Sequence, residues 1–132
     1  MLRLTGREVG NCLPLNVFTA LLTYCLFVVF RWLVEHKKAF YCNGGKATDL
    51  CHAYNGQPIC IFDYVRDAKE YVGYGVIEQL KNGILFSPKY ESGLKRFDIP
   101  HVFIFANFLL EDGKFSADRI KLYELNSIGQ IL

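Results

Sequence analysis

A long run without any charged residue near the start of the chain restricts how the molecule folds. Residues 10–30 read GNCLPLNVFTALLTYCLFVVF, and basic residues lie on both sides of the run. Apolar side chains recur in it at helical spacing, which predicts a helix over residues 13–34. A bilayer needs about 20 apolar residues. Residues 10–34 therefore predict either a membrane-associated helix or a helix of the protein core.

The predicted helix is apolar on every side, and such a helix must be buried all round or lie in lipid. If it covers one side of a sheet, its outer face stays unsatisfied in a chain of 132 residues. We therefore expect a large exposed apolar surface there. One stripe recurs at spacings of three and four residues and consists of Leu15, Phe18, Leu22, Cys25, Val29 and Trp32.

The rest of the chain has the pattern of an α/β unit. Residues 58–62 (PICIF) and 101–107 (HVFIFAN) are short apolar runs, typical of buried parallel strands. Between them the pattern predicts a helix over 68–82 and a hairpin over 84–97, and an edge strand is predicted over 119–125. This order indicates an open nucleotide-binding sheet, whose ligands lie beyond the carboxyl ends of the strands.

Three residues affect where the predicted helix over 68–82 begins, how stable it is and where it ends. Asp67 stands where a capping residue begins a helix. Gly73 weakens the helix by about 1 kcal/mol, and Gly83 ends it after Asn82.

Composition and cysteine content narrow the class of protein. The net charge of +2 does not by itself favour nucleic acid, and 52% hydrophobic residues exclude a disordered chain. The five cysteines are odd in number and form no C-x-x-C, which favours a reducing compartment over a secreted disulfide scaffold. Cys42, Cys51 and Cys60 recur every nine residues. That spacing fits no common zinc pattern, and burial as small apolar side chains is the alternative.

The sequence Gly44-Gly45-Lys46 resembles part of a phosphate-binding loop but fails its requirements. Such a loop reads G-x-x-x-x-G-K-[ST], with a hydroxyl after the lysine to hold Mg²⁺. Here Ala47 follows the lysine, and Phe40 stands where the first glycine belongs. A turn is therefore predicted at this place.

Blocks of sequence in a fixed order carry a family resemblance. AFYCNGGKATDLCHAYNGQPICIFDYVRDAKEYVGYGVIEQLKNGILFSPKYESGLKRF, continued by ANFLLEDGKFSADRIKL, resembles the superfamily 3 helicase domain of nanovirus and alphasatellite replication-associated proteins. These proteins initiate rolling-circle replication of small circular single-stranded DNA. The resemblance implies an α/β fold with the parallel sheet of a partial, AAA+-like P-loop NTPase, preceded here by the apolar helix. It divides the chain into residues 1–37 outside the resemblance, a helicase-like domain over 38–126 and a tail over 127–132.

Two elements of the family pattern are missing from this sequence. It contains neither the His-x-His metal pair of the nicking endonuclease nor the G-x-x-G-x-x-G-K-S phosphate loop. Its N-terminus reads LTGREVGNCLPL, in which Gly6 and Gly10 are a candidate remnant of that loop. The family binds ATP and Mg²⁺. The resemblance therefore implies descent from an ATP-dependent DNA helicase, and the missing loop predicts that this chain does not turn over ATP by itself.

The resemblance assigns three candidate catalytic residues. Asp63 ends the first apolar run and would hold Mg²⁺ through water. Asn107 ends the second run and would orient the attacking water or sense the γ-phosphate. Arg119 would act as an arginine finger toward a neighbouring subunit. Turn-forming roles for Asp63 and Asn107, and a surface ion pair for Arg119, are the alternatives.

The predicted hairpin carries the candidate nucleic-acid contacts, which are Lys89, Lys95 and Arg96, with Tyr90 and Phe97 interleaved. Cations that contact phosphates and aromatic rings that stack on bases are what single-stranded DNA binding requires. A solvated charged hairpin is the alternative.

The resemblance also implies partners and a location. Single-stranded DNA, a homo-oligomeric ring and mixing with an intact replication initiator are the expected interactions, and the host nucleus is the expected location. Two alternatives stay open from the sequence. One is a non-enzymatic DNA-binding or oligomerising module, and the other is a small membrane-anchored protein.

Overall fold

The computed structural model describes residues 17–64, 66–106, 108, 110–111 and 113–115. A three-stranded parallel sheet lies at its centre, in the order β1-β2-β5. These strands are β1 (Phe40–Cys42), β2 (Ile59–Tyr64) and β5 (His101–Ala106). The predicted apolar strands over 58–62 and 101–107 are therefore confirmed as the sheet's central strand and its neighbour. The predicted strand over 119–125 lies outside the described residues.

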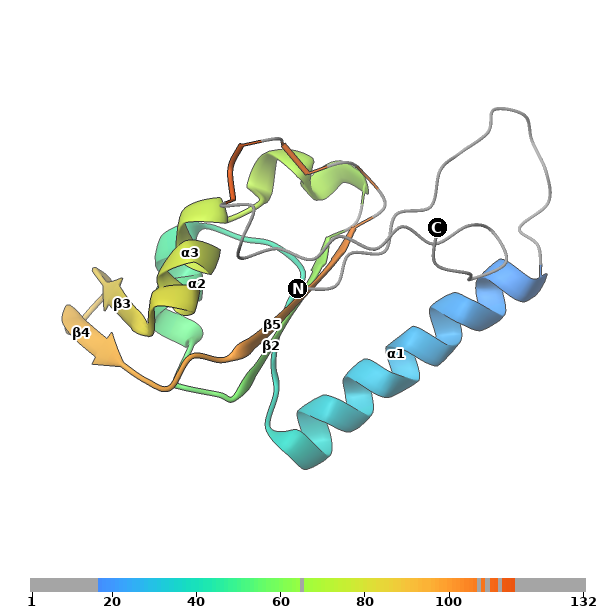
Figure 1. Cartoon of the computed structure of the whole chain (residues 1–132), viewed down its shortest axis with the longest axis horizontal. Coiled ribbons are helices and arrows are strands. Elements are labelled where there is room, and N and C mark those ends of the chain that lie inside the picture. Colours follow the sequence, from blue (N-terminus) through green and yellow to red (C-terminus); the bar gives the residue numbers. More distant parts are fainter. Residues whose placement is uncertain (1–16, 65, 107, 109, 112, 116–132) are drawn as a thin grey trace.

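Helices cover both faces of this sheet (Figure 1). Helix α1 (Val17–Lys37) lies against one face, and α2 (Ala47–Ala53) and α3 (Tyr74–Asn82) lie against the other. Covering both faces explains why β2 reads as a continuous apolar run, since side chains of both alternating sets must be buried. Cys60, Ile61 and Phe62 are fully buried in succession.

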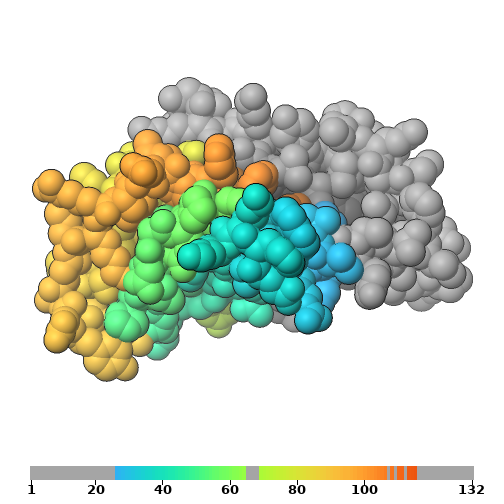
Figure 2. Space-filling view, turned by 90° about the horizontal axis from the view of Figure 1, so that it is seen from below, coloured from blue at the N-terminus to red at the C-terminus, as the bar shows by residue number. Residues whose placement is uncertain are grey.

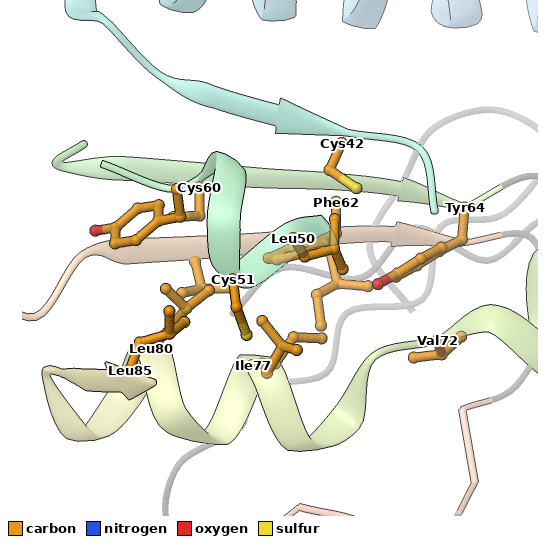
Figure 3. Packing of buried hydrophobic residues seen from close by; sticks show 14 of the residues in the cluster. Cys42, Leu50, Cys51, Cys60, Phe62, Tyr64, Val72, Ile77, Leu80 and Leu85 are labelled. Atoms are coloured by element: carbon orange, nitrogen blue, oxygen red, sulfur yellow. The ribbon is translucent and has the colours of Figure 1, made fainter. Parts of the chain in front are cut away.

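The larger core lies between the sheet and the α2–α3 layer (Figure 3). Phe62 and Tyr64 of β2 point from the sheet toward this layer, where Ile77 and Leu80 of α3 meet them. Cys42, Cys51 and Cys60 belong to the same core as free thiols, so burial explains them. Within the described part of the chain, no group of three or more histidine, cysteine or acidic residues could hold a metal ion.

Helix α1 packs one stripe of its surface on the opposite face of the sheet. Phe30 is buried between Ile61 of β2 and Phe105 of β5, and the rings of Phe30 and Phe105 lie 4.5 Å apart. Leu26 and Leu33 flank Phe30 at positions i−4 and i+3. The predicted stripe through Val29 and Trp32 is therefore not the packed one, because those two side chains face solvent at 50% and 48% exposure.

The outer face of α1 stays apolar and exposed, as the sequence predicted. Phe27, Val28 and Trp32 are each about half exposed or more. The sequence left open whether residues 10–34 associate with a membrane. In the part of the chain described here, no helix combines the length and the apolar character that crossing a bilayer requires.

The predicted helix over 68–82 is divided in two. A 3-10 helix, η1 (Arg66–Tyr71), comes first, and α3 begins only at Tyr74. Gly73 stands at the break with φ −78° and ψ 62°, outside helical geometry. Asp67 therefore does not begin a continuous helix, and Tyr71 at the end of η1 is 60% exposed. The predicted end is confirmed, since Gly83 caps α3 in the left-handed region at φ 73°.

The predicted hairpin over 84–97 is confirmed as a separate two-stranded antiparallel sheet. It consists of β3 (Ile84–Ser87) and β4 (Gly93–Arg96), with Phe86 opposite Leu94. Leu85 and Ser87 point inward and are buried, which fixes the hairpin against α2 and α3. It lies at the end of the molecule away from α1 (Figure 1).

Candidate functional site

Asp63 lies at the carboxyl edge of the parallel sheet, where ligands of open α/β sheets bind. It is the second-last residue of β2 and pairs with Phe105 of β5. The sequence predicted that Asp63 ends this strand, and in the structure the strand extends one residue further, since Tyr64 pairs with Ala106. Its side chain is half-buried on the α1 face, the face that Ile61 also occupies two residues earlier.

Tyr41 of β1 holds this carboxylate. The Tyr41 hydroxyl donates a hydrogen bond of 2.8 Å to Asp63 Oδ2. Burial, together with this hydrogen bond and the negative charge of Asp63, raises the pKa of Tyr41 to about 12. The phenol is therefore a proton donor throughout the neutral range. No sequence motif singled out Tyr41, because only strand pairing brings it next to Asp63.

The Gly44-Gly45-Lys46 loop follows β1 at the same edge of the sheet and leads into α2. Gly44 and Gly45 have φ of 122° and 135°, a region that only glycine adopts readily. The Gly44 N–H donates to Cys42 Sγ at 3.3 Å. The structure has a bend at Asn43 and a loop over residues 44–46, and backbone geometry explains the two glycines.

A single carboxylate fits one way of binding Mg²⁺. Mg²⁺ keeps several waters and is commonly held by one or two carboxylates together with substrate phosphates. Asp63 fits that mode, although the described residues supply no all-protein cage. In it, the ion would be held through water and would neutralise charge on a nucleotide's phosphates. The other two candidate catalytic residues, Asn107 and Arg119, lie outside the described residues.

Lys95, one of the three predicted DNA contacts, forms hydrogen bonds within the protein. Its ammonium donates to the carbonyl oxygens of Cys51, His52 and Tyr54 at 2.9, 2.7 and 2.6 Å. These carbonyls belong to the C-terminal end of α2, where a helix leaves acceptors without partners. Lys95 is therefore a C-terminal cap of α2. Its role as a DNA contact stays a prediction.

The other two predicted cations are at the surface. Lys89 forms an ion pair with Asp49 of α2, and its ammonium lies 5.9 Å from the centre of the Tyr90 ring. Tyr90 is 85% exposed at the tip of the hairpin. Arg96 is exposed at the base of the hairpin. The hairpin that carries these residues belongs to the yellow and orange part of the chain, which forms one end of the molecular surface in Figure 2.

The outer face of the hairpin is apolar, which the sequence analysis did not anticipate. Ile84, Phe86 and Leu94 are 47%, 54% and 56% exposed, and Arg96 lies opposite Ile84 on the same face. The signal was the alternation in ILFS, whose second and fourth residues point inward. An aromatic ring and a cation on one exposed sheet face suit the stacking and phosphate contacts of single-stranded nucleic acid.

Two hollows accompany these residues. The larger, of about 500 Å³, lies between α2, α3 and the hairpin and is lined mainly by apolar groups, among them Val72, Tyr74 and Phe86. It does not include Asp63, so this hollow and the candidate catalytic carboxylate are separate. The smaller, of about 290 Å³, is formed by Asn55, Gly56, Lys95, Arg96 and Phe97. Arg96 therefore lines a shallow pocket at the base of the hairpin.

Several viral replication proteins are similar in sequence to this chain. The master replication protein of faba bean necrotic yellows virus is 51% identical over 90 residues, which cover 68% of this chain and 32% of that protein. That of banana bunchy top virus is 48% identical over 92 residues, covering 70% and 32%. Para-Rep C6 of subterranean clover stunt C6 alphasatellite is 46% identical over 86 residues, covering 62% and 30%.

The chain is a homologue of the nanovirus and alphasatellite replication proteins. It spans about a third of the length of these relatives. The family resemblance drawn from the sequence is thereby confirmed. No protein-family model matches the chain. No solved structure matches it either, so the superfamily 3 helicase fold stays a prediction beyond the observed α/β architecture.

Proposed function

We propose that this homologue of nanovirus replication proteins acts in rolling-circle replication of circular single-stranded DNA, as a helicase-like part that binds DNA and Mg²⁺. The observation that carries the proposal is the half-buried Asp63 at the carboxyl edge of the central strand, in a chain 51% identical to a viral master replication protein. In this proposal Asp63 holds Mg²⁺ through water, and the hairpin contacts the DNA.

The ATP-dependent step is not assigned to this chain alone. A loop that cradles the phosphates is central to phosphoryl transfer, and the sequence contains no G-x-x-x-x-G-K-[ST]. This supports a second candidate, a non-enzymatic DNA-binding or oligomerising module that joins an intact replication initiator. The exposed apolar faces of α1 and of the hairpin support association with other subunits. Replication of viral DNA would place the protein in the host nucleus.

The salt dependence of single-stranded DNA binding tests the DNA part of the proposal. Each phosphate contact releases condensed counterions and contributes about 0.7 to the log–log slope for single strands. We expect Arg96→Gln and Lys89→Gln each to reduce the slope by about that amount, whatever the base sequence. Fluorescence anisotropy of a labelled oligonucleotide at several salt concentrations measures it.

Lys69→Gln is the matched control, since it removes the same charge from an exposed residue of η1 outside the hairpin. It should leave the slope unchanged. Equal slopes for the unaltered chain and for the Arg96 and Lys89 variants would refute the hairpin as the DNA contact.

A further inference from the structure

Tyr41 reaches Asp63 because of the register between their two strands. Tyr41 lies directly opposite Ile61, and Asp63 is two residues further along β2 on the same face. Paired strands lie about 4.8 Å apart and rise about 3.3 Å per residue, so a neighbour two residues further along is about 8 Å away, within reach of an aromatic side chain. A tyrosine therefore spans the gap and ends in a hydroxyl group at the carboxylate.

A third element contacts the Tyr41 ring. The ring of Phe30, on α1, lies 6.1 Å from that of Tyr41, and Phe30 itself is buried against Phe105. Side chains of α1 and β2 thus border Tyr41 of β1. The Tyr41 side chain is 38% exposed, and its hydroxyl donates to one oxygen of Asp63.

We propose that Tyr41 is a positioning residue, which holds Asp63 through Oδ2 and leaves Oδ1 to accept a water of a hydrated Mg²⁺ ion. Among the described residues, Oδ1 has no hydrogen-bond partner of its own. The inference rests on the proposed Mg²⁺ role of Asp63. It adds a residue from the neighbouring strand whose loss weakens the metal site although it does not touch the metal. Hydrogen-bonded partners of ligating carboxylates commonly act in this way.

The experiment uses Mn²⁺ alone as a paramagnetic probe on the full chain. Bound Mn²⁺ broadens the NMR signals of nearby amides, so the broadening at residues 62–64 reports the occupancy of this site. The unaltered chain should show saturable broadening there, and Asp63→Asn should abolish it. Tyr41→Phe should weaken the apparent affinity about tenfold or more. Tyr71→Phe removes the hydroxyl of an exposed tyrosine on η1 and should change nothing.

The outcomes separate the two ideas. Broadening lost in Asp63→Asn but unchanged in Tyr41→Phe overturns the positioning role and leaves the proposed metal role standing. Broadening that persists in Asp63→Asn overturns the metal role of Asp63. An absence of broadening in the unaltered chain also overturns it. In either case the positioning role of Tyr41 is overturned too, because it depends on the metal role. Urea unfolding of Tyr41→Phe is the second measurement. Lower stability with unchanged Mn²⁺ affinity would show that the hydrogen bond is structural only.

Discussion

The Lys95 ammonium nitrogen lies 2.6 Å from the carbonyl oxygen of Tyr54 and ties the second strand of the hairpin to the end of α2. Lys89, in the loop of the same hairpin, forms an ion pair with Asp49 in the first turn of α2. Both ends of this short helix are therefore held by the hairpin. Because α2 directly follows the Gly44-Gly45-Lys46 loop, the hairpin and the carboxyl edge of the sheet are joined through one helix.

Replacing Lys95 should cost stability more than it changes DNA contacts. Lys95→Met removes three charge-assisted hydrogen bonds to carbonyl oxygens, and we expect a loss of about 1–3 kcal/mol in the free energy of unfolding. Urea denaturation measures it. Arg96→Gln, on the next residue of the same strand, removes the same charge from an exposed position and should stay within about 0.5 kcal/mol. Similar stability for the two variants would contradict the capping role.

Two phenylalanines of α1 should differ sharply in their effect on stability. Phe30 is 6% exposed and Phe27 is 59% exposed. Phe30→Ala should cost about 3–5 kcal/mol, because it opens a cavity between α1 and the sheet. Phe27→Ala should stay within about 0.5 kcal/mol and should reduce self-association measured by light scattering. Equal losses would show that α1 does not pack on the sheet through Phe30.

The fold should lose stability at alkaline pH. Burial raises the pKa of the Cys60 thiol to about 12, and burial raises the pKa of Tyr54 and Tyr64 as well. Between the pKa of the unfolded chain, about 9 for the thiol and 10 for a tyrosine, and the higher folded value, the native state holds protons that the unfolded state releases. Stability is therefore fully present below pH 9 and falls as the pH rises toward 12.

The urea midpoint measured from pH 7 to pH 11 checks this expectation. Tyr54→Phe should flatten the alkaline decline, because the variant has no hydroxyl to ionise at that buried position. At neutral pH it should cost about 1 kcal/mol, since the Tyr54 hydroxyl donates to the carbonyl of Gln57 at 2.8 Å. A midpoint that stays constant to pH 11 would contradict the burial of these groups.

The purified chain should release no phosphate from ATP above background, with or without single-stranded DNA. The physical reason is the missing lysine and hydroxyl of a phosphate loop, which Lys46 followed by Ala47 does not replace. A colorimetric phosphate assay with Mg²⁺ measures it, with Asp63→Asn as the reference for background. Turnover that needs Mg²⁺ and disappears in Asp63→Asn would overturn this expectation.

Patterns of the longest apolar runs predicted most of the architecture. The strands around Ile61 and Ile104 are buried on both faces, and such strands leave a continuous apolar signature. Gly83 was predictable as a helix end, because the left-handed conformation after a helix favours glycine. The exposed outer face of α1 also followed from the sequence, since one sheet buries only one side of a helix.

The errors arose where tertiary contacts override local pattern. Spacing alone did not show that Gly73 interrupts the helix after β2, because an isolated glycine only weakens a helix in general. Nothing local distinguishes Lys95 from Arg96, yet strand alternation turns the first toward α2 and the second toward solvent. Tyr41 was missed because its partner is 22 positions away and becomes adjacent only through strand pairing.

The parallel sheet has a consequence for how the molecule forms. Ile59 pairs with His101, although η1, α3 and the whole hairpin lie between them in the chain. Loop closure of that length must precede the pairing, whereas α3 and the hairpin are local and need no such closure. The local elements can therefore form first, before the apolar strands β2 and β5 have paired. Aggregation is therefore favoured early in folding, while these apolar strands are still exposed. The sheet edge that carries Asp63 is among the last parts to form.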